Sequence, residues 1–189
     1  MGLANSLSVL RILLIPVFVS LMVYRKPAAG LLVFAAAAFT DLLDGWVARR
    51  TGPSRLGAFL DPMADKLLLT ASFVTLAYLK VLPFWIAAVV ISRDVILVVG
   101  ALLIHMLGGR LHPRPTLIGK LAMFFQVLTV LLGLLTRYLP LPLALRPMIW
   151  LAAVFTVLSG LQYIVQGMRV LNASHGVDRE AERDTTYFR

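Results

Sequence analysis

The sequence predicts an all-α polytopic membrane protein with six transmembrane helices. Hydrophobic residues make up 60% of its 189 residues and charged residues only 14%, and the mean hydropathy is +0.88. These values lie outside the usual range of soluble domains. Apolar stretches long enough to cross a bilayer as helices recur with short connections at 7–24, 29–47, 62–80, 82–107, 117–137 and 148–168. We therefore expect one membrane domain, residues 1–171, and a solvated, disordered cytoplasmic tail, residues 172–189.

The charge distribution favours a membrane over nucleic acid as the reason for the net charge of +9. With both termini in the cytoplasm, eleven basic residues fall on the inner side and five, Arg25, Lys26, Lys80, Arg137 and Arg146, on the outer side, with Lys66 and Arg93 left unassigned. This bias follows the positive-inside rule, and a basic inner face suits anionic head groups. We expect a multi-pass protein of the bacterial inner membrane. Cysteine is absent, which excludes thiolate metal sites.

The first two helices bring charge into apolar sequence. Arg11 lies deep in the first stretch and is either an interface anchor or a partner for acidic residues. In the second helix Asp41, Asp44, Gly45 and Ala48 share one face of about 60°. Gly45 costs helix stability, up to about 1 kcal/mol relative to Ala. We interpret it as leaving room for a ligand at the backbone; helix packing alone is the alternative.

The third helix adds two more carboxylates. Asp61 and Asp65 are four residues apart and so share a face. Asp61 precedes Pro62, and a residue before proline disfavours the α conformation, so Asp61 alone could be an N-cap. The preceding polar connection contains the turn signal Gly52-Pro53.

These four of the nine acidic residues predict a functional site at the cytoplasmic membrane interface. An ionised carboxylate in hydrocarbon costs at least about 2.5–3.5 kcal/mol, so cations or water must offset them. Oxygen-only ligands favour Mg²⁺ or Mn²⁺, and four carboxylates suffice for two ions about 3.5–4 Å apart, as in phosphoryl transfer. The alternative is a structural ion-pair network with Arg49, Arg50 and Lys66.

The later helices carry basic candidates. Arg93 and Asp94 lie in mid-span of the fourth helix. One interpretation is that they pair with each other, although adjacent helical residues point about 100° apart. The other is that Arg93 binds the phosphate of an acceptor substrate. Arg114 and Lys120, with Arg93, would form a basic wall facing the carboxylates. His105 is interpreted as an ordinary interface histidine.

Polar and aromatic residues complete the last helices. Gln126, Gln162, Tyr163 and Gln166 are candidates for hydrogen bonds between helices. Trp85, Tyr138 and Trp150 lie where an outer aromatic belt would be.

The acidic motif resembles a known family. The pattern Asp41-x2-Asp44-Gly45-x2-Ala48-Arg49, followed by Gly57-x3-Asp61-x3-Asp65, resembles the signature of the CDP-alcohol phosphatidyltransferases. Ile91-Ser92-Arg93-Asp94 and Ile118-Gly119-Lys120 are similar to its glycerophospholipid branch. The seven residues between Arg49 and Gly57 are one fewer than the usual minimum of eight, which would alter the shape of the nucleotide loop.

The resemblance implies roles for these residues. Asp41, Asp44, Asp61 and Asp65 would hold two divalent ions, Mg²⁺ or Mn²⁺, and Asp65 would also be the general base on the acceptor alcohol. Asp44, Gly45, Ala48, Arg49 and Gly57 would bind the cytidine diphosphate, and Arg93, Arg114 and Lys120 the acceptor. Catalysis would then consist mostly of positioning and charge stabilisation.

The implied reaction transfers a phosphatidyl group from CDP-diacylglycerol to an alcohol and releases CMP, in an enzyme that forms homodimers. We favour sn-glycerol 3-phosphate as acceptor, because the basic wall suits a phosphate dianion. Phosphatidylglycerol, the acceptor of CMP-forming cardiolipin synthases, is the alternative, since the stretches around Arg93 and Lys120 also resemble those enzymes. An ion-coupled transporter is a more remote alternative, because intramembrane carboxylates also bind transported ions.

Overall fold

The computed structural model describes the backbone of residues 3–51, 57–106, 116–136, 138 and 142–187, and the side chains of residues 9–40, 63–103, 106, 116–136, 138 and 144–168. Within the described backbone the chain forms six α-helices and no strand: α1 (Leu3–Val23), α2 (Pro27–Thr51), α3 (Gly57–Tyr78), α4 (Phe84–Met106), α5 (Leu117–Leu135) and α6 (Pro142–Tyr187). The all-helical prediction is confirmed. The turn predicted at Gly52-Pro53 lies outside the described residues.

Among the described residues, three helices are long and apolar enough to cross a membrane, over Phe84–Leu103, Leu117–Leu135 and Ala144–Met168. The described apolar parts of α1 and α2, Val9–Val23 and Pro27–Thr40, are shorter. The chain is thus a membrane protein. Helix α6 runs through Tyr187, well beyond residue 168, where the sequence predicted the end of the last apolar helix. Arg, Glu and Ala in this segment are good helix formers, and no proline interrupts it.

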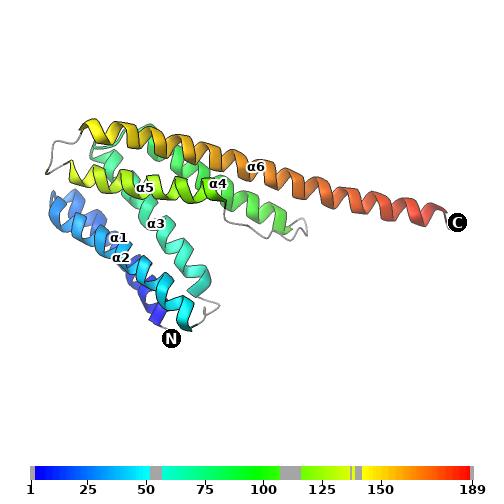
Figure 1. Ribbon diagram of the computed structural model, residues 1–189, viewed down its shortest axis with the longest axis horizontal. Helices are drawn as coiled ribbons and strands as arrows, with labels where there is room; N and C mark the ends of the chain where they lie inside the picture. The colour runs from blue at the N-terminus through cyan, green and yellow to red at the C-terminus, as the bar shows by residue number, and fades with distance from the viewer. Residues whose placement is uncertain (1–2, 52–56, 107–115, 137, 139–141, 188–189) are drawn as a thin grey trace.

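The helices form two groups with α3 between them (Figure 1). Helices α1 and α2 lie side by side, α4, α5 and α6 form the second group, and α3 packs against α1, α4 and α5. In this view the α1–α2 pair lies near α5 at one end and diverges from it toward the other. The extra length of α6 projects beyond the bundle.

Two tight turns of the same kind define one end of this bundle, which we call the turn end. After α1, the Lys26 N–H donates to the Leu21 carbonyl at 2.8 Å and the Arg25 N–H to the Met22 carbonyl at 3.2 Å. After α3, Val81 and Lys80 repeat this pattern. Arg25 has a φ of 57° and Lys80 a φ of 59°. This is the Schellman motif, in which glycine usually occupies the left-handed position, so here two cations take it.

The core packs α1, α2, α3 and α5 around large apolar side chains. Phe18 and Phe34 are buried with ring centroids 6.0 Å apart, and Phe73, Leu76 and Val130 are fully buried beside them. Helix α6 packs on α4 and α5 through small buried residues, Ala152, Ala153, Thr156, Ser159 and Gly160. Small residues let membrane helices approach closely.

Candidate functional site

A buried ion pair joins α1 to α3. The Arg11 side chain is fully buried, and its Nη1 donates to Oδ1 of Asp65. Asp65 keeps 21% of its side chain exposed. A buried cation is costly unless it is paired, so this contact fixes the two helices at one register. Of the two interpretations of Arg11, the partner for the acidic residues is confirmed.

The next residue on α3 continues the polar contacts toward α4 and α6. Lys66 Nζ donates to Oδ1 of Asp94, and Arg93 Nη1 donates to the same oxygen at 2.8 Å. Arg93 Nη2 donates to Ser159 Oγ on α6 at 3.0 Å. We call Arg11, Asp65, Lys66, Arg93 and Asp94 the charged cluster; it links α1, α3, α4 and α6 across the bundle.

Arg93 has hydrogen-bonding capacity left over. Its Nε is buried and has no hydrogen-bond partner among the described residues. Leaving a buried donor unsatisfied costs about 1–3 kcal/mol or more for a charged group, and such atoms often mark a place where a ligand supplies the acceptor. Arg93 can therefore receive an anion without giving up Asp94 or Ser159.

The start of α5 lies beside Arg93. Thr116 is the N-cap of α5, and its Oγ1 accepts from the Gly119 N–H at 3.1 Å. A Cβ on Gly119 would lie 3.5 Å from Ser159 Oγ and 4.0 Å from Arg93 Nη2. Glycine thus leaves open the space between the start of this helix and Arg93. The positive end of the helix dipole adds to the guanidinium there, while the side chain of Lys120 is exposed.

Two apolar clefts flank the charged cluster. One, with about 980 Å³ of empty space, is lined from α2, α3 and α5 by residues that include Ala37, Ala38, Asp65 and Phe124. The other, with about 650 Å³, lies between α4 and α6 and is lined by residues that include Ser92, Arg93 and Gly160. Each cleft combines a hydrocarbon wall with one charged residue, which suits an amphipathic ligand.

The remaining predicted residues are described less fully. Backbone positions alone are described for those on the later part of α2 and the start of α3, namely Asp41, Asp44, Gly45, Ala48, Arg49, Gly57 and Asp61; Arg114 lies outside the described residues, as does the side chain of His105. The backbone puts Asp41 and Asp44 toward the end of α2 and Asp61 near the start of α3. Within the described side chains, no three His, Asp or Glu residues form a group that could hold a metal ion.

One expectation about local geometry needs correction, and one open alternative is confirmed. Asp61 is not an N-cap, because α3 begins four residues earlier at Gly57; a proline near the start of a helix removes a hydrogen bond where the loss is small. Arg93 and Asp94 do pair, although their side chains leave the helix about 100° apart. The length and flexibility of the arginine side chain overcome that divergence.

Ser159 was not among the residues predicted from the sequence, whereas one hydrogen bond near it was. Gln126 Nε2 donates to Thr156 Oγ1 at 2.8 Å, so the expected interhelical hydrogen bond of Gln126 is confirmed. Thr156, Ser159 and Gln162 recur every three residues on α6. Such a polar stripe in an apolar helix indicates the face that points into the bundle, and it could have identified Ser159.

A helical membrane protein with buried ion pairs and acidic residues on two consecutive helices belongs to the class of membrane enzymes and transporters that work on charged ligands. Comparison with known proteins narrows the class. Residues 1–158 match the family model described as CDP-alcohol phosphatidyltransferase. The chain belongs to the CDP-alcohol phosphatidyltransferase family, and is therefore an enzyme rather than a transporter.

Individual relatives agree with the family model. The chain is 31% identical over 194 residues to the CDP-diacylglycerol–glycerol-3-phosphate 3-phosphatidyltransferase of Bacillus subtilis, covering 92% of this chain and 99% of that protein. It is 33% identical over 176 residues to a probable phosphatidylglycerophosphate synthase of Mycobacterium tuberculosis, covering 89% and 82%. It is 39% identical over 118 residues to the human CMP-forming cardiolipin synthase, covering 61% of this chain and 38% of that protein.

Proposed function

We propose that this protein transfers the phosphatidyl group of CDP-diacylglycerol to sn-glycerol 3-phosphate and releases CMP. The observation that carries the proposal is the position of Asp65, which lies in a buried ion pair and also lines an apolar cleft. A carboxylate at the edge of hydrocarbon suits a reaction between a charged head group and a lipid. The two relatives aligned over more than 80% of their length carry names for this reaction.

The reaction exchanges a phosphoanhydride bond for a phosphoester bond. The acceptor hydroxyl attacks the phosphorus that carries diacylglycerol, the bond from this phosphorus to the CMP oxygen breaks, and the hydroxyl proton passes to Asp65. Arg11 holds Asp65 toward the cleft, since the two side chains are paired. The donor's acyl chains would lie along the α2–α3–α5 cleft, where Ala37 and Ala38 leave room beside Phe124.

Asp41, Asp44, Asp61 and Asp65 would hold two divalent cations, most simply Mg²⁺. Carboxylate oxygens without nitrogen or sulfur ligands are the donor set that fits this metal. Bound there, the ions would offset the charge of the pyrophosphate and of the departing CMP. Gly45, Ala48, Arg49 and Gly57, on the same helices, would bind the cytidine diphosphate, where residues with little or no side chain leave space and Arg49 supplies charge.

Arg93 would bind the phosphate of glycerol 3-phosphate. Its buried Nε donor has no hydrogen-bond partner among the described residues, and Gly119 places no side chain near its Nη2, which lies 4.0 Å from the position that a Cβ would take. Lys120 and Arg114, from the start of α5 and the loop before it, would add positive charge. With six spans and both termini in the cytoplasm, this site would face the cytoplasmic leaflet of the bacterial inner membrane. We also propose that two copies of this chain form a homodimer.

One observation favours phosphatidylglycerol as the acceptor instead. The cleft between α4 and α6 is largely apolar and reaches Arg93, so a lipid acceptor could enter from the bilayer with its phosphodiester toward the guanidinium. The reaction would then be that of a CMP-forming cardiolipin synthase.

The product lipid distinguishes these acceptors. Purified protein in detergent is given CDP-diacylglycerol and Mg²⁺ with either glycerol 3-phosphate or phosphatidylglycerol, and lipids are identified by mass spectrometry. We expect phosphatidylglycerophosphate with the first acceptor and no new lipid with the second. Cardiolipin from the second alone would move the assignment to the alternative, and no product from either would contradict the proposed function.

A further inference from the structure

We propose that the turn end of the bundle holds a second lipid site, which binds the phosphate of an anionic phospholipid through Arg25. The site is a pocket with about 620 Å³ of empty space between the α1–α2 turn, the end of α3 and the end of α5. Arg11 lies twelve residues before the end of α1, so the pocket is about 18 Å along the helix from the charged cluster at 1.5 Å per residue. It is separate from the proposed active site.

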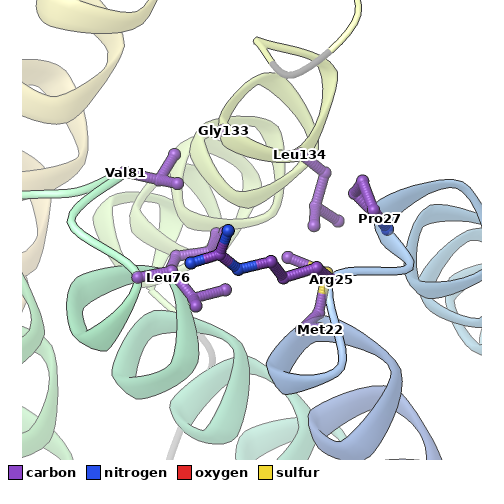
Figure 2. Close-up of a pocket in the computed structure, with 8 residues that line it drawn as sticks. Met22, Arg25, Pro27, Leu76, Val81, Gly133 and Leu134 are labelled. Atoms are coloured by element: carbon purple, nitrogen blue, oxygen red, sulfur yellow. The ribbon is translucent and has the colours of Figure 1, made fainter.

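The guanidinium of Arg25 points into this pocket. Figure 2 shows its side chain reaching from the α1–α2 turn across the pocket toward Leu76 and Val81, with Leu134 above it in this view. No side-chain hydrogen bond or ion pair joins the Arg25 guanidinium to another described residue. Arginine presents five donors in a fixed fork that matches phosphate oxygens.

The walls of the pocket are hydrocarbon. Met22, Leu76 and Leu134 are almost fully buried side chains at its edge. Gly133 keeps the wall on α5 open: a Cβ there would lie 3.2 Å from Leu76 Cδ1 and 3.7 Å from Val81 Cγ1. A free phosphate ion would gain nothing from these walls, whereas the glycerol backbone and upper acyl chains of a phospholipid would.

The turn end is positively charged and would therefore attract an anion. The described basic residues here are Arg25, Lys26, Lys80 and Arg146, whereas the sequence has no Asp or Glu at 1–40, 66–93 or 95–177. The chain therefore supplies no carboxylate near the turn end. In a membrane the abundant anion at helix ends is the lipid phosphate, and its charge attracts the cations of this end.

Aromatic residues place the pocket at head-group depth. Tyr24, Tyr78 and Phe84 flank the two turns and are 75–77% exposed, and Trp85 stacks obliquely on Trp150 at 5.2 Å between ring centroids. Aromatic side chains gather where a membrane protein meets the interface. The Arg25 guanidinium thus lies at the level of lipid phosphates, with apolar walls beside it.

The backbone conformation gives a variant that removes the guanidinium without harming the fold. Arg25 and Lys80 occupy equivalent left-handed positions, which glycine adopts without strain. Lys80 lines a different hollow, with Tyr78, Pro83 and Phe84. Arg25→Gly therefore removes the side chain that is proposed to bind the lipid phosphate. Lys80→Gly is a matched control that removes one cation from the same end at the same kind of turn.

The experiment measures binding of dioleoyl phosphatidic acid to the three purified proteins in detergent, because neither proposed reaction uses this lipid as acceptor. We expect Arg25→Gly to bind at least about tenfold more weakly than wild type, since a charge-assisted hydrogen bond is lost, and Lys80→Gly to stay within about twofold. Unfolding midpoints of both variants close to that of wild type would establish that they fold.

Two further ligands test the chemistry. Inorganic phosphate and dioleoyl phosphatidylcholine should bind much more weakly, the first because it lacks chains and the second because it lacks net charge. Equal phosphatidic acid affinities in wild type and Arg25→Gly would overturn the proposal. So would an equal loss in Lys80→Gly, which indicates diffuse charge attraction, or phosphate binding as tight as that of the lipid. Because the catalytic residues are identical in all three proteins, none of these outcomes depends on the proposed function.

Discussion

The charged cluster and the turn end differ in how their charges are balanced. In the cluster, each buried or half-buried charge has a partner on another helix or beside it: Arg11 with Asp65, and Lys66 and Arg93 with Asp94. At the turn end, Arg25 has no such partner among the described residues. Charges inside the bundle are therefore balanced by other residues of the chain, whereas the Arg25 charge at the turn end depends on an anion from outside the chain.

The largest effect should come from breaking the buried pair. Arg11→Met leaves Asp65 without that cation, and loss of one member of a buried pair costs about 3–5 kcal/mol. The free energy of unfolding, measured in detergent, should fall by about that amount. The double variant Arg11→Met with Asp65→Asn should recover much of the loss, because the negative charge that Arg11 balanced is then removed together with the positive one. No recovery in the double variant would contradict the pairing.

The second-largest effect should come from Arg93→Gln. It removes the guanidinium proposed to bind the acceptor, so kcat/KM for glycerol 3-phosphate should fall about 100-fold, equivalent to about 2.7 kcal/mol of transition-state stabilisation. The apparent KM for CDP-diacylglycerol should stay within about threefold. Arg146→Gln, an exposed arginine at the turn end, is the matched control and should leave both constants unchanged. Equal losses for both substrates would count against a specific role for Arg93.

The smallest effect should come from Lys80→Gly. Glycine relieves the left-handed strain of roughly 1–2 kcal/mol but gives the unfolded chain more freedom, so the two terms largely offset each other. The unfolding free energy should change by less than about 1 kcal/mol in either direction. A fall in the unfolding free energy of 2 kcal/mol or more would indicate that the Lys80 side chain makes a stabilising contact within the chain.

The elements that the sequence could predict are those set by local composition. The six helices follow from apolar runs interrupted by short polar connections, and their order and type are confirmed. The start of α3 at Gly57 and the length of α6 were missed. Helix propensity and backbone hydrogen bonding continue past the edge of an apolar run, so hydropathy alone ends such helices too early.

The site could be predicted in its residue types but only in part in its contacts. Arg11 was recognised as a candidate partner because a cation deep in an apolar helix needs one. The pairing of Lys66 with Asp94, and of Arg93 with Ser159, was not predicted. These contacts depend on the rotation of α3, α4 and α6 about their axes, which the packing of the whole bundle determines.

The most direct test of the account is the rate of CMP release from CDP-diacylglycerol, with Mg²⁺ and saturating acceptor, in wild type, Asp65→Asn and Asp178→Asn. Asp65 lies in the charged cluster, whereas Asp178 is a carboxylate near the far end of α6. We predict that Asp65→Asn loses about a thousandfold in rate, within the range for removing a general base, and that Asp178→Asn keeps the wild-type rate. Wild-type turnover in a folded Asp65→Asn protein would contradict the claim that chemistry takes place at this carboxylate.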